Sequence, residues 1–366
     1  MLFCYGKVVS GELFYDRVKA QKELKTLVNN GQSFMLKAPR RYGKTSIIKH
    51  ILQNDEYFYI DLRKVPHLEL LNKKLLEYVY SLMGITGALK QLKENAISFL
   101  RSHRTTITVS VGIFESSVEL FTSDKSDEDK FIGILETLKA ISQEKKGTIK
   151  IVFDEFQEIK KLSKKVDLAE VLRAEIQHRE KVCYMFAGSN MTMMTELFEK
   201  ASSPFYNFGR KAVLNPFDEK ELSVEVIAAF KNRGIIFEKD ELIHDLIKRC
   251  DGHPANTMLV LQIIEFTMQT QSLNTITEQI VDKCYCEAQL EMNDLVMEYL
   301  KEIRTKEHLH DVIFKEANNI PQTLDASSLQ QKRKALVDMG HLQIISRGKY
   351  KIIDNFLRDE LINEAI

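Results

Sequence analysis

The chain has 366 residues, 44% of them hydrophobic, and its 52 lysines and arginines balance its 52 aspartates and glutamates. This length and composition exclude a mainly disordered chain and predict about two or three domains, each able to bury its own core. The zero net charge argues against a protein that coats nucleic acid through bulk positive charge, although it leaves a local basic patch open.

Five cysteines are scattered along the sequence without a Cys-x-x-Cys motif or a paired Cys/His spacing. Such a set fits neither a disulfide framework nor a zinc site, and a reducing cytoplasm is its simplest location. No apolar run approaches the roughly 18 residues of a membrane span, and the N-terminal residues lack a basic leader before an apolar stretch. We therefore expect a cytoplasmic protein that is neither secreted nor inserted in a membrane.

The first 215 residues alternate short apolar runs with amphipathic stretches. The short runs, each predicted as a buried strand, cover residues 33–37, 57–62, 148–153 and 182–187. The amphipathic stretches, each predicted as a helix, cover residues 15–30, 45–52, 67–84, 88–101 and 131–145. Residues 105–111 and 115–121 alternate as in a β-hairpin, which we interpret as an insertion. Strands that alternate with helices predict an α/β domain over 1–215, with a parallel sheet covered on both faces.

After Asn215-Pro-Phe the strand-like runs stop. Helical patterns over residues 222–231, 240–249, 254–270 and 276–290 predict a helical domain over 216–290. The last part, 291–366, has the order of a winged helix. Its expected elements are helices over 294–304, 308–316 and 327–339, then strands over 342–345 and 349–353 around Arg347-Gly348.

Residues 38–45 read Ala-Pro-Arg-Arg-Tyr-Gly-Lys-Thr, which matches the phosphate-binding loop pattern with alanine at the first glycine. Gly43 lets the backbone approach phosphate oxygens, and the N–H groups at the start of the next helix face their charge. Lys44 is expected to reach the β- and γ-phosphates, and Thr45 to place its hydroxyl on Mg²⁺. The alternative is a basic surface loop. The residues predicted to bind ATP are Ala38, Pro39, Arg40, Arg41, Tyr42, Gly43, Lys44, Thr45 and Ser46.

Two adjacent carboxylates, Asp154 and Glu155, follow the apolar strand over 148–153. We expect Asp154 to hold Mg²⁺ together with Thr45, and Glu155 to orient and polarise the attacking water as a general base. The alternative is a solvated acidic turn. The presence of Glu155 favours hydrolysis over a switch that only binds nucleotide.

Polar residues near the last two strands are further candidates. Gly188-Ser189-Asn190 follows the strand over 182–187, and we choose Asn190 as a sensor of the γ-phosphate or the attacking water, with a helix cap as the alternative. Arg210 precedes the strand-like residues 211–214, in a position to act at the phosphates of its own or a neighbouring subunit, as arginine fingers do. An ordinary surface arginine is the alternative there.

These motifs follow one another in a characteristic order. They are Phe-Tyr-Asp-Arg at 14–17, Arg-Arg-Tyr-Gly-Lys-Thr-Ser at 40–46, Asp-Glu-Phe-Gln at 154–157, Phe-Ala-Gly-Ser at 186–189 and Phe-Gly-Arg at 208–210. The chain resembles the archaeal-type ATPase family, P-loop proteins of the AAA+/STAND group that also occur in bacteria. The resemblance covers about residues 10–290. It implies a five-stranded core sheet with the P-loop strand central, a helical lid, and nucleotide at the seam between them. It also implies that Pro254 opens a lid helix over the nucleotide, although a proline in the first turn of a helix explains this residue equally well.

Positive charge gathers in one part of the C-terminal domain. Over 326–351 there are six cations and one anion, Asp338, although 291–366 as a whole is not basic. A recognition helix and wing would lie in this stretch, and phosphate contacts need such clustering. The residues predicted to contact nucleic acid are Lys332, Arg333, Lys334, Arg347 and Lys349. A protein-binding module with a solvated basic face is the alternative.

Two functions remain from the sequence. The first is an ATPase that hydrolyses Mg-ATP as a molecular switch and relays lid motion to the winged helix. The second is a DNA-binding regulator or scaffold in which ATP turnover is incidental. The expected partners are ATP, duplex DNA or a protein at the winged helix, and further copies of the chain in a nucleotide-dependent homo-oligomer.

Overall fold

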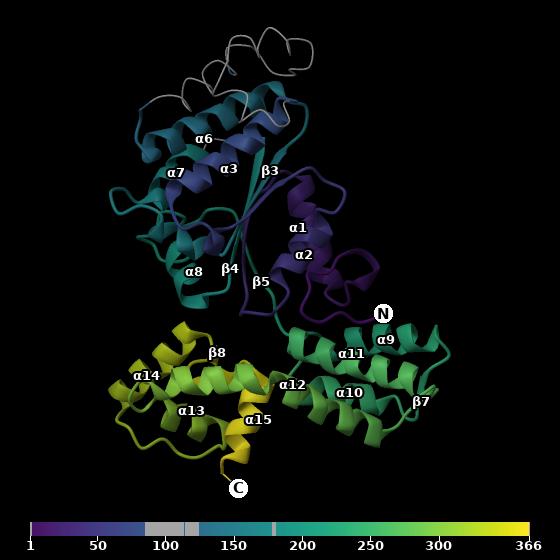
Figure 1. The fold of residues 1–366 in the computed structure, drawn as a ribbon. Helices are drawn as coiled ribbons and strands as arrows, with labels where there is room; N and C mark the ends of the chain where they lie inside the picture. Colours follow the sequence, from purple (N-terminus) through teal and green to yellow (C-terminus); the bar gives the residue numbers. More distant parts are fainter. Residues whose placement is uncertain (1, 85–112, 114–123, 178–180, 366) are drawn as a thin grey trace.

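The computed structural model describes residues 2–84, 113, 124–177 and 181–365. In Figure 1 a domain built on a sheet stands above two smaller parts, and α12 (Glu278–Arg304) runs beneath it and joins them. The helix expected over 88–101 lies outside the described residues. So does the expected hairpin, since residue 113 is the only one described between 85 and 123.

Five parallel strands form the sheet, in the order β2-β3-β4-β1-β5. The strands are β1 (Phe34–Lys37), β2 (Phe58–Asp61), β3 (Ile149–Asp154), β4 (Val182–Gly188) and β5 (Arg210–Val213). The five-stranded parallel sheet expected from the sequence is confirmed, but its central strand is β4, and the P-loop strand β1 lies between β4 and the edge strand β5. Because the carboxyl ends of parallel strands meet at one edge, the loops that follow β1 to β4 lie together there. We call this edge the phosphate edge, and Arg210 begins its strand at the opposite one.

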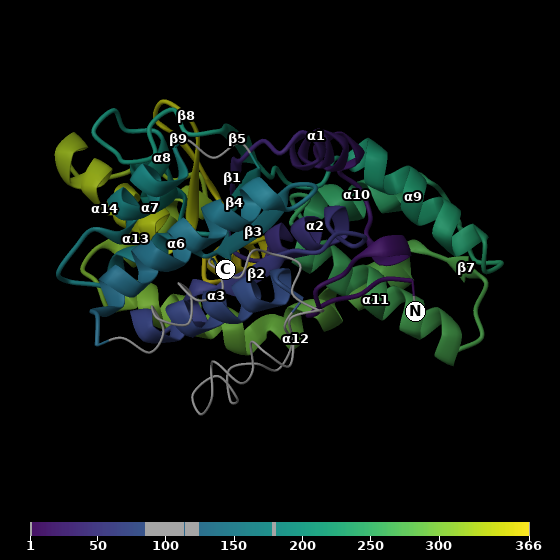
Figure 2. The ribbon, with the colours of Figure 1, turned by 90° about the horizontal axis from the view of Figure 1, so that it is seen from above.

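Helices cover both faces of the sheet (Figures 1 and 2). One face is covered by α1 (Val18–Asn29) and α2 (Lys44–Ile51), and the other by α3 (Leu68–Leu82), α6 (Asp127–Glu144), α7 (Leu168–Ile176) and α8 (Met191–Phe198). Successive residues of β3 point to opposite faces of the sheet. Ile151 and Phe153 pack against the face covered by α3, α6, α7 and α8, and Val152 packs against the face covered by α1 and α2. Burial on both faces explains why these strands read as continuous apolar runs.

The helical part after the sheet, which we call the lid as a label only, contains α9 (Glu219–Lys231), α10 (Glu241–Arg249) and α11 (Pro254–Thr270). A short parallel pair, β6 (Ile236–Phe237) with β7 (Thr275–Ile276), was not expected. The separation of helices at 276–290 and 294–304 is wrong, because α12 runs unbroken through both. Buried residues continue across the expected gap at a spacing of three or four: Cys284, Ala288, Met292, Val296, Leu300 and Ile303. The boundary placed between 290 and 291 therefore falls inside one helix.

The C-terminal part has the element order expected for a winged helix. After α12 come α13 (Leu309–Ala317), α14 (Ala326–Met339) and an antiparallel pair, β8 (Leu342–Ser346) with β9 (Lys349–Ile352). A last helix, α15 (Asn355–Asn363), was not expected. Side chains of this part and of the lid share one hydrophobic core, so α12 joins two regions that pack together. Among the described residues, no helix has both the length and the apolar character needed to span a membrane.

Candidate functional site

The loop between β1 and α2 has the conformation that its motif predicts. Gly43 caps α2 with a φ of 78°, a left-handed conformation that glycine adopts without steric cost. Ala38 is fully buried in the core beneath α1 and α2, which accommodates its methyl group. The Lys44 ammonium donates hydrogen bonds to the carbonyls of Ala38 and Pro39, at 3.1 Å each. Burial lowers the pKa of Lys44, while the nearby charges of Glu155 and Asp154 act in the opposite direction.

Asp154, at the end of β3, joins the loop to the sheet. Its Oδ2 accepts hydrogen bonds from the Thr45 hydroxyl at 2.7 Å and the Tyr59 hydroxyl at 2.6 Å. The two residues predicted to hold Mg²⁺ are therefore in contact. A carboxylate and a hydroxyl oxygen suit this ion, which takes its other ligands from water and substrate phosphates. Thr45 and Asp154 thus fit the metal, and Tyr59, which the sequence did not single out, orients the carboxylate.

Glu155 is held from several sides and is buried. Its Oε2 accepts hydrogen bonds from the Ser189 hydroxyl at 2.5 Å, the Ser189 N–H at 3.1 Å and the Gln157 amide at 2.7 Å. Burial would raise the pKa of this carboxyl, but the charge of Lys44, these hydrogen bonds and Arg63 outweigh it and hold the pKa below its usual range. The backbone has a φ of 52°, a conformation that costs a non-glycine residue about 1–3 kcal/mol and is typical of functional sites.

Arg63, which no sequence motif singled out, lies at the same edge. It follows β2 in the short 3₁₀ turn η2 (Leu62–Lys64), and its Nη1 is 3.7 Å from Oε1 of Glu155. Its position in the sequence could have indicated this role, because Arg63 is a basic residue that directly follows a buried strand whose carboxyl end lies at the same edge as the phosphate loop. The edge therefore holds Lys44 and Arg63 on either side of one carboxylate.

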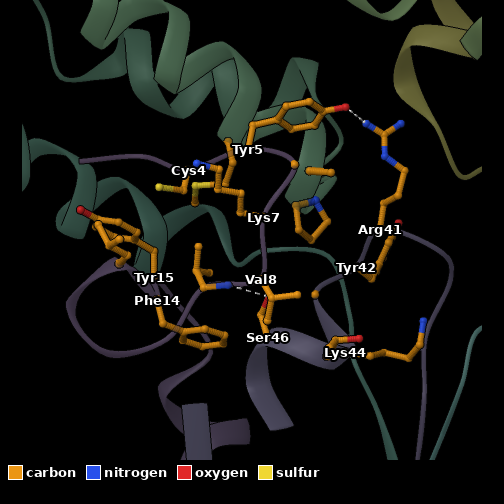
Figure 3. Close-up of a pocket in the computed structure, with 18 of the residues that line it drawn as sticks. Cys4, Tyr5, Lys7, Val8, Phe14, Tyr15, Arg41, Tyr42, Lys44 and Ser46 are labelled. Carbon is orange, nitrogen blue, oxygen red and sulfur yellow. Dashed lines mark hydrogen bonds between the residues drawn. The ribbon is translucent and has the colours of Figure 1, made fainter. Parts of the chain in front are cut away.

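A cavity of about 530 Å³ opens beside the phosphate loop. Its lining includes one carboxylate, Glu155, and a larger set of cations: Lys7, Arg17, Arg40, Arg41, Lys44 and Arg63. Apolar and aromatic side chains, among them Phe14 and Tyr15, line it at some distance from Lys44 (Figure 3). The volume is within the range of small-molecule sites. A cavity with a cationic part and an apolar part suits a ligand with phosphates and an aromatic base.

The N-terminal residues close this cavity toward the lid. The backbone N–H of Leu2 donates to Glu265 of α11, and that of Tyr5 donates to Gln262. The N–H of Val9 donates to the Ser46 hydroxyl in the phosphate loop. One short segment thus bridges the lid and the loop, so the cavity depends on both.

Arg41 of the phosphate loop contacts other parts of the chain. Its Nη2 donates a hydrogen bond to the Tyr5 hydroxyl in the N-terminal segment (Figure 3). Nη2 also lies 3.5 Å from the Met292 sulfur in α12. Nη1 is buried without a hydrogen bond, 3.7 Å from Oδ2 of Asp354 before α15. A single side chain of the loop therefore reaches both the lid and the C-terminal part.

Comparison with known proteins identifies the family. A family described as the ATPase domain predominantly from Archaea matches residues 14–260. The chain belongs to this family. No curated protein matches the sequence.

Solved structures agree with the fold of this archaeal-type ATPase. A Walker-type ATPase of Pyrococcus abyssi superposes with a TM-score of 0.69 at 16% identity, covering 99% of this chain and 100% of its own. The ORC2 protein of Aeropyrum pernix, solved as ADPNP–ADP complexes, gives a TM-score of 0.56 at 14% identity, covering 99% and 97%. Its ADP form gives 0.53 at 12% identity, covering 100% and 97%. At these identities the likeness shows the fold.

Not every residue singled out from the sequence reaches the site of this ATPase. Asn190 caps α8 by accepting a hydrogen bond from the N–H of Met193, which is the alternative role considered for it. Its neighbour Ser189 contacts Glu155 instead. Arg210 pairs in register with Phe34 at the start of β1, a full strand away from the phosphate loop. The structure therefore places Arg210 at the opposite end of the sheet from the phosphate loop of its own subunit. Pro254 is the first residue of α11 and does line the cavity.

The cations of the C-terminal part fall into two groups. Arg333 is mostly buried, donates to Glu316 at 2.7 Å and lies over the Tyr350 ring, 4.6 Å from its centroid. Lys351 forms an ion pair with Asp251 at 2.8 Å. In this conformation Arg333 is thus committed to packing, and its contact with nucleic acid stays a prediction. Lys334, Arg347 and Lys349 are exposed, and Lys332 is half-buried.

Proposed function

We propose that the protein binds Mg-ATP in the cavity beside the phosphate loop and hydrolyses it. The observation that carries the proposal is the set of groups at the phosphate edge: Lys44, the contact between Thr45 and Asp154, and a held carboxylate at Glu155. Similarity to an ORC2 protein solved with ADPNP and ADP supports a nucleotide as the ligand.

Each of these groups has a task in hydrolysis. Lys44 and the N–H groups at the start of α2 bind the phosphates, and Thr45 with Asp154 holds Mg²⁺, which would neutralise charge on the phosphate oxygens. Glu155 accepts a proton from the attacking water. Ser189 and Gln157 fix the orientation of its carboxylate and keep it ionised at neutral pH.

The substitution Glu155→Gln tests the hydrolytic role. We expect ATP turnover to fall by about 100-fold or more, because general-base catalysis contributes about 10²–10⁴. The affinity for ATP should change by less than about threefold, since the phosphate loop is intact. Phosphate release and equilibrium nucleotide binding are the measurements. Glu158→Gln is the matched control, because Glu158 lies in the next turn and forms an ion pair with Lys161. Unchanged turnover in Glu155→Gln would remove the proposed base.

We also propose that the nucleotide state is relayed to the lid and the C-terminal part, as in a molecular switch. Arg41 supports this, because it belongs to the phosphate loop and contacts Tyr5, Met292 and Asp354. A change of the loop on ATP binding would change these contacts together. The apolar core that the lid shares with the C-terminal part would carry the movement along α12.

A nucleotide-dependent DNA-binding regulator is the second candidate. The exposed cations Lys334, Arg347 and Lys349 on α14 and the β8–β9 hairpin favour it, since such clusters neutralise phosphates. A protein partner at the same surface is the competing possibility, and measurement of the salt dependence of binding to duplex DNA separates the two.

Two further points are proposals of the same kind. Arg210 is exposed and far from its own phosphate loop, which suits action on a neighbouring subunit in a nucleotide-dependent homo-oligomer. Particle size measured with and without ATP tests this. All five cysteines are unpaired, which suits a reducing cytoplasm.

A further inference from the structure

Arg63 is a cation at the phosphate edge that the proposed chemistry has not yet used. It lines the cavity with Lys44 and Glu155 and is half-exposed. Its partners are both carboxylates: Asp61, at 3.2 Å from Nη2, and Glu155, at 3.7 Å from Nη1. It therefore reaches the cavity from β2, opposite the loop that carries Lys44.

Arg63 is itself half-exposed, so water screens its contacts with Asp61 and Glu155, although both carboxylates are largely buried. A terminal phosphate carries more charge than one carboxylate and offers several acceptor oxygens to the planar guanidinium. A γ-phosphate placed beside Lys44 would therefore compete well for Arg63.

We propose that Arg63 is the cation that distinguishes ATP from ADP in this site, by binding the γ-phosphate within the same subunit. This rests on the proposed function. When ATP is bound, Arg63 leaves Glu155, and that carboxylate is free to act on water. When ADP is bound, Arg63 returns to Glu155 and Asp61. The phosphate edge thus contains its own arginine in cis, while Arg210 lies at the opposite edge.

Arg63 assists the hydrolysis of the bond between the γ-phosphorus and the bridging oxygen. The water oxygen forms a bond to the γ-phosphorus, and the bond from that phosphorus to the bridging oxygen breaks. The bridging oxygen keeps the electron pair as part of ADP, and one proton of the water passes to Glu155. Arg63 stabilises the charge on the γ-phosphate oxygens during this transfer.

The experiment compares Arg63→Ala, Arg63→Lys and Lys64→Ala in the full chain. Lys64 is the matched control, because it is exposed in the same turn and does not line the cavity. Binding of ADP and of a non-hydrolysable ATP analogue is measured alongside phosphate release. In Arg63→Ala we expect turnover to fall by about 100-fold or more. Its preference for the analogue over ADP should fall by about tenfold, with ADP affinity unchanged. Arg63→Lys should restore part of both, since lysine keeps the charge and loses the fork.

A selective loss of affinity for the analogue, with the affinity for ADP unchanged, is a readout that a merely structural role of Arg63 would not give. An unchanged preference for the analogue over ADP in Arg63→Ala would overturn the proposal. Equal losses in Lys64→Ala would do the same. If the wild type binds the analogue and releases no phosphate, hydrolysis fails as the function. The binding preference then still decides the role of Arg63.

Discussion

The phosphate edge and the C-terminal part both contain the cations expected from the sequence, but the two regions use them differently. At the phosphate edge, Lys44 is held by loop carbonyls and faces the cavity, together with a second cation, Arg63. In the C-terminal part, Arg333 and Lys351 are already paired with Glu316 and Asp251. The backbone of the phosphate loop fixes the position of Lys44. In the C-terminal part, by contrast, each cation either packs against the protein or faces solvent, depending on which side of its helix or strand it occupies.

The largest effect on stability expected from this comparison is at Arg333. In Arg333→Ala the free energy of unfolding should fall by about 1–3 kcal/mol, because the substitution removes a hydrogen-bonded charge pair and the packing against Tyr350. Lys334→Ala, on the exposed side of the same helix, should change it by less than about 0.5 kcal/mol. Thermal or urea unfolding of the two variants makes the comparison. Equal effects would show that the division of these cations into packed and free groups is wrong.

A smaller effect is expected where the two regions meet, at Arg41 and Asp354. The substitution Asp354→Asn keeps an acceptor for the N–H of Phe356 at the start of α15 and removes the charge that faces Arg41. A double-mutant cycle with Arg41→Gln should give a coupling energy of about 0.5–1 kcal/mol without nucleotide. We expect this coupling to decrease when ATP is bound, because the relay moves the loop. A coupling of zero in both states would remove Arg41 as the link.

The sequence predicted the phosphate edge well because the chemistry there is local. The Gly43-Lys44-Thr45 run and the Asp154-Glu155 pair each follow a buried strand, and parallel strands bring their ends together. Ser189, Tyr59 and Arg63 were not assigned because their roles depend on which strand lies beside which, and strand order is a tertiary property. The choice of Asn190 over Ser189 shows the same limit, because both residues suit a helix cap and only the fold shows which one reaches Glu155.

The limits were different in the C-terminal half. The break expected between 290 and 294 was placed in a polar stretch, but Met292 continues the buried stripe of α12 and no proline or glycine interrupts it. The pairing of Arg333 with Glu316 joins two residues that are 17 positions apart on different helices, and sequence spacing alone does not fix that contact. The sequence predicted the helix that carries Arg333, but it did not show which distant residue pairs with that side chain.

The smallest effect on stability should come from the exposed cations, and it isolates their function. Replacing Lys334, Arg347 and Lys349 together by alanine should change the free energy of unfolding by less than about 0.5 kcal/mol, since all three are exposed. If the surface binds duplex DNA, the slope of log affinity against log salt should become shallower by about one for each phosphate that the variant no longer neutralises. Fluorescence anisotropy with duplex DNA at several salt concentrations, with ATP and with ADP, gives this slope. Arg333→Ala is the control, because it removes the same charge from a packed position. An unchanged slope in the triple variant, or no binding of the wild type at low salt, would assign this surface to a protein partner or to solvent, and the ATPase would then act through other contacts.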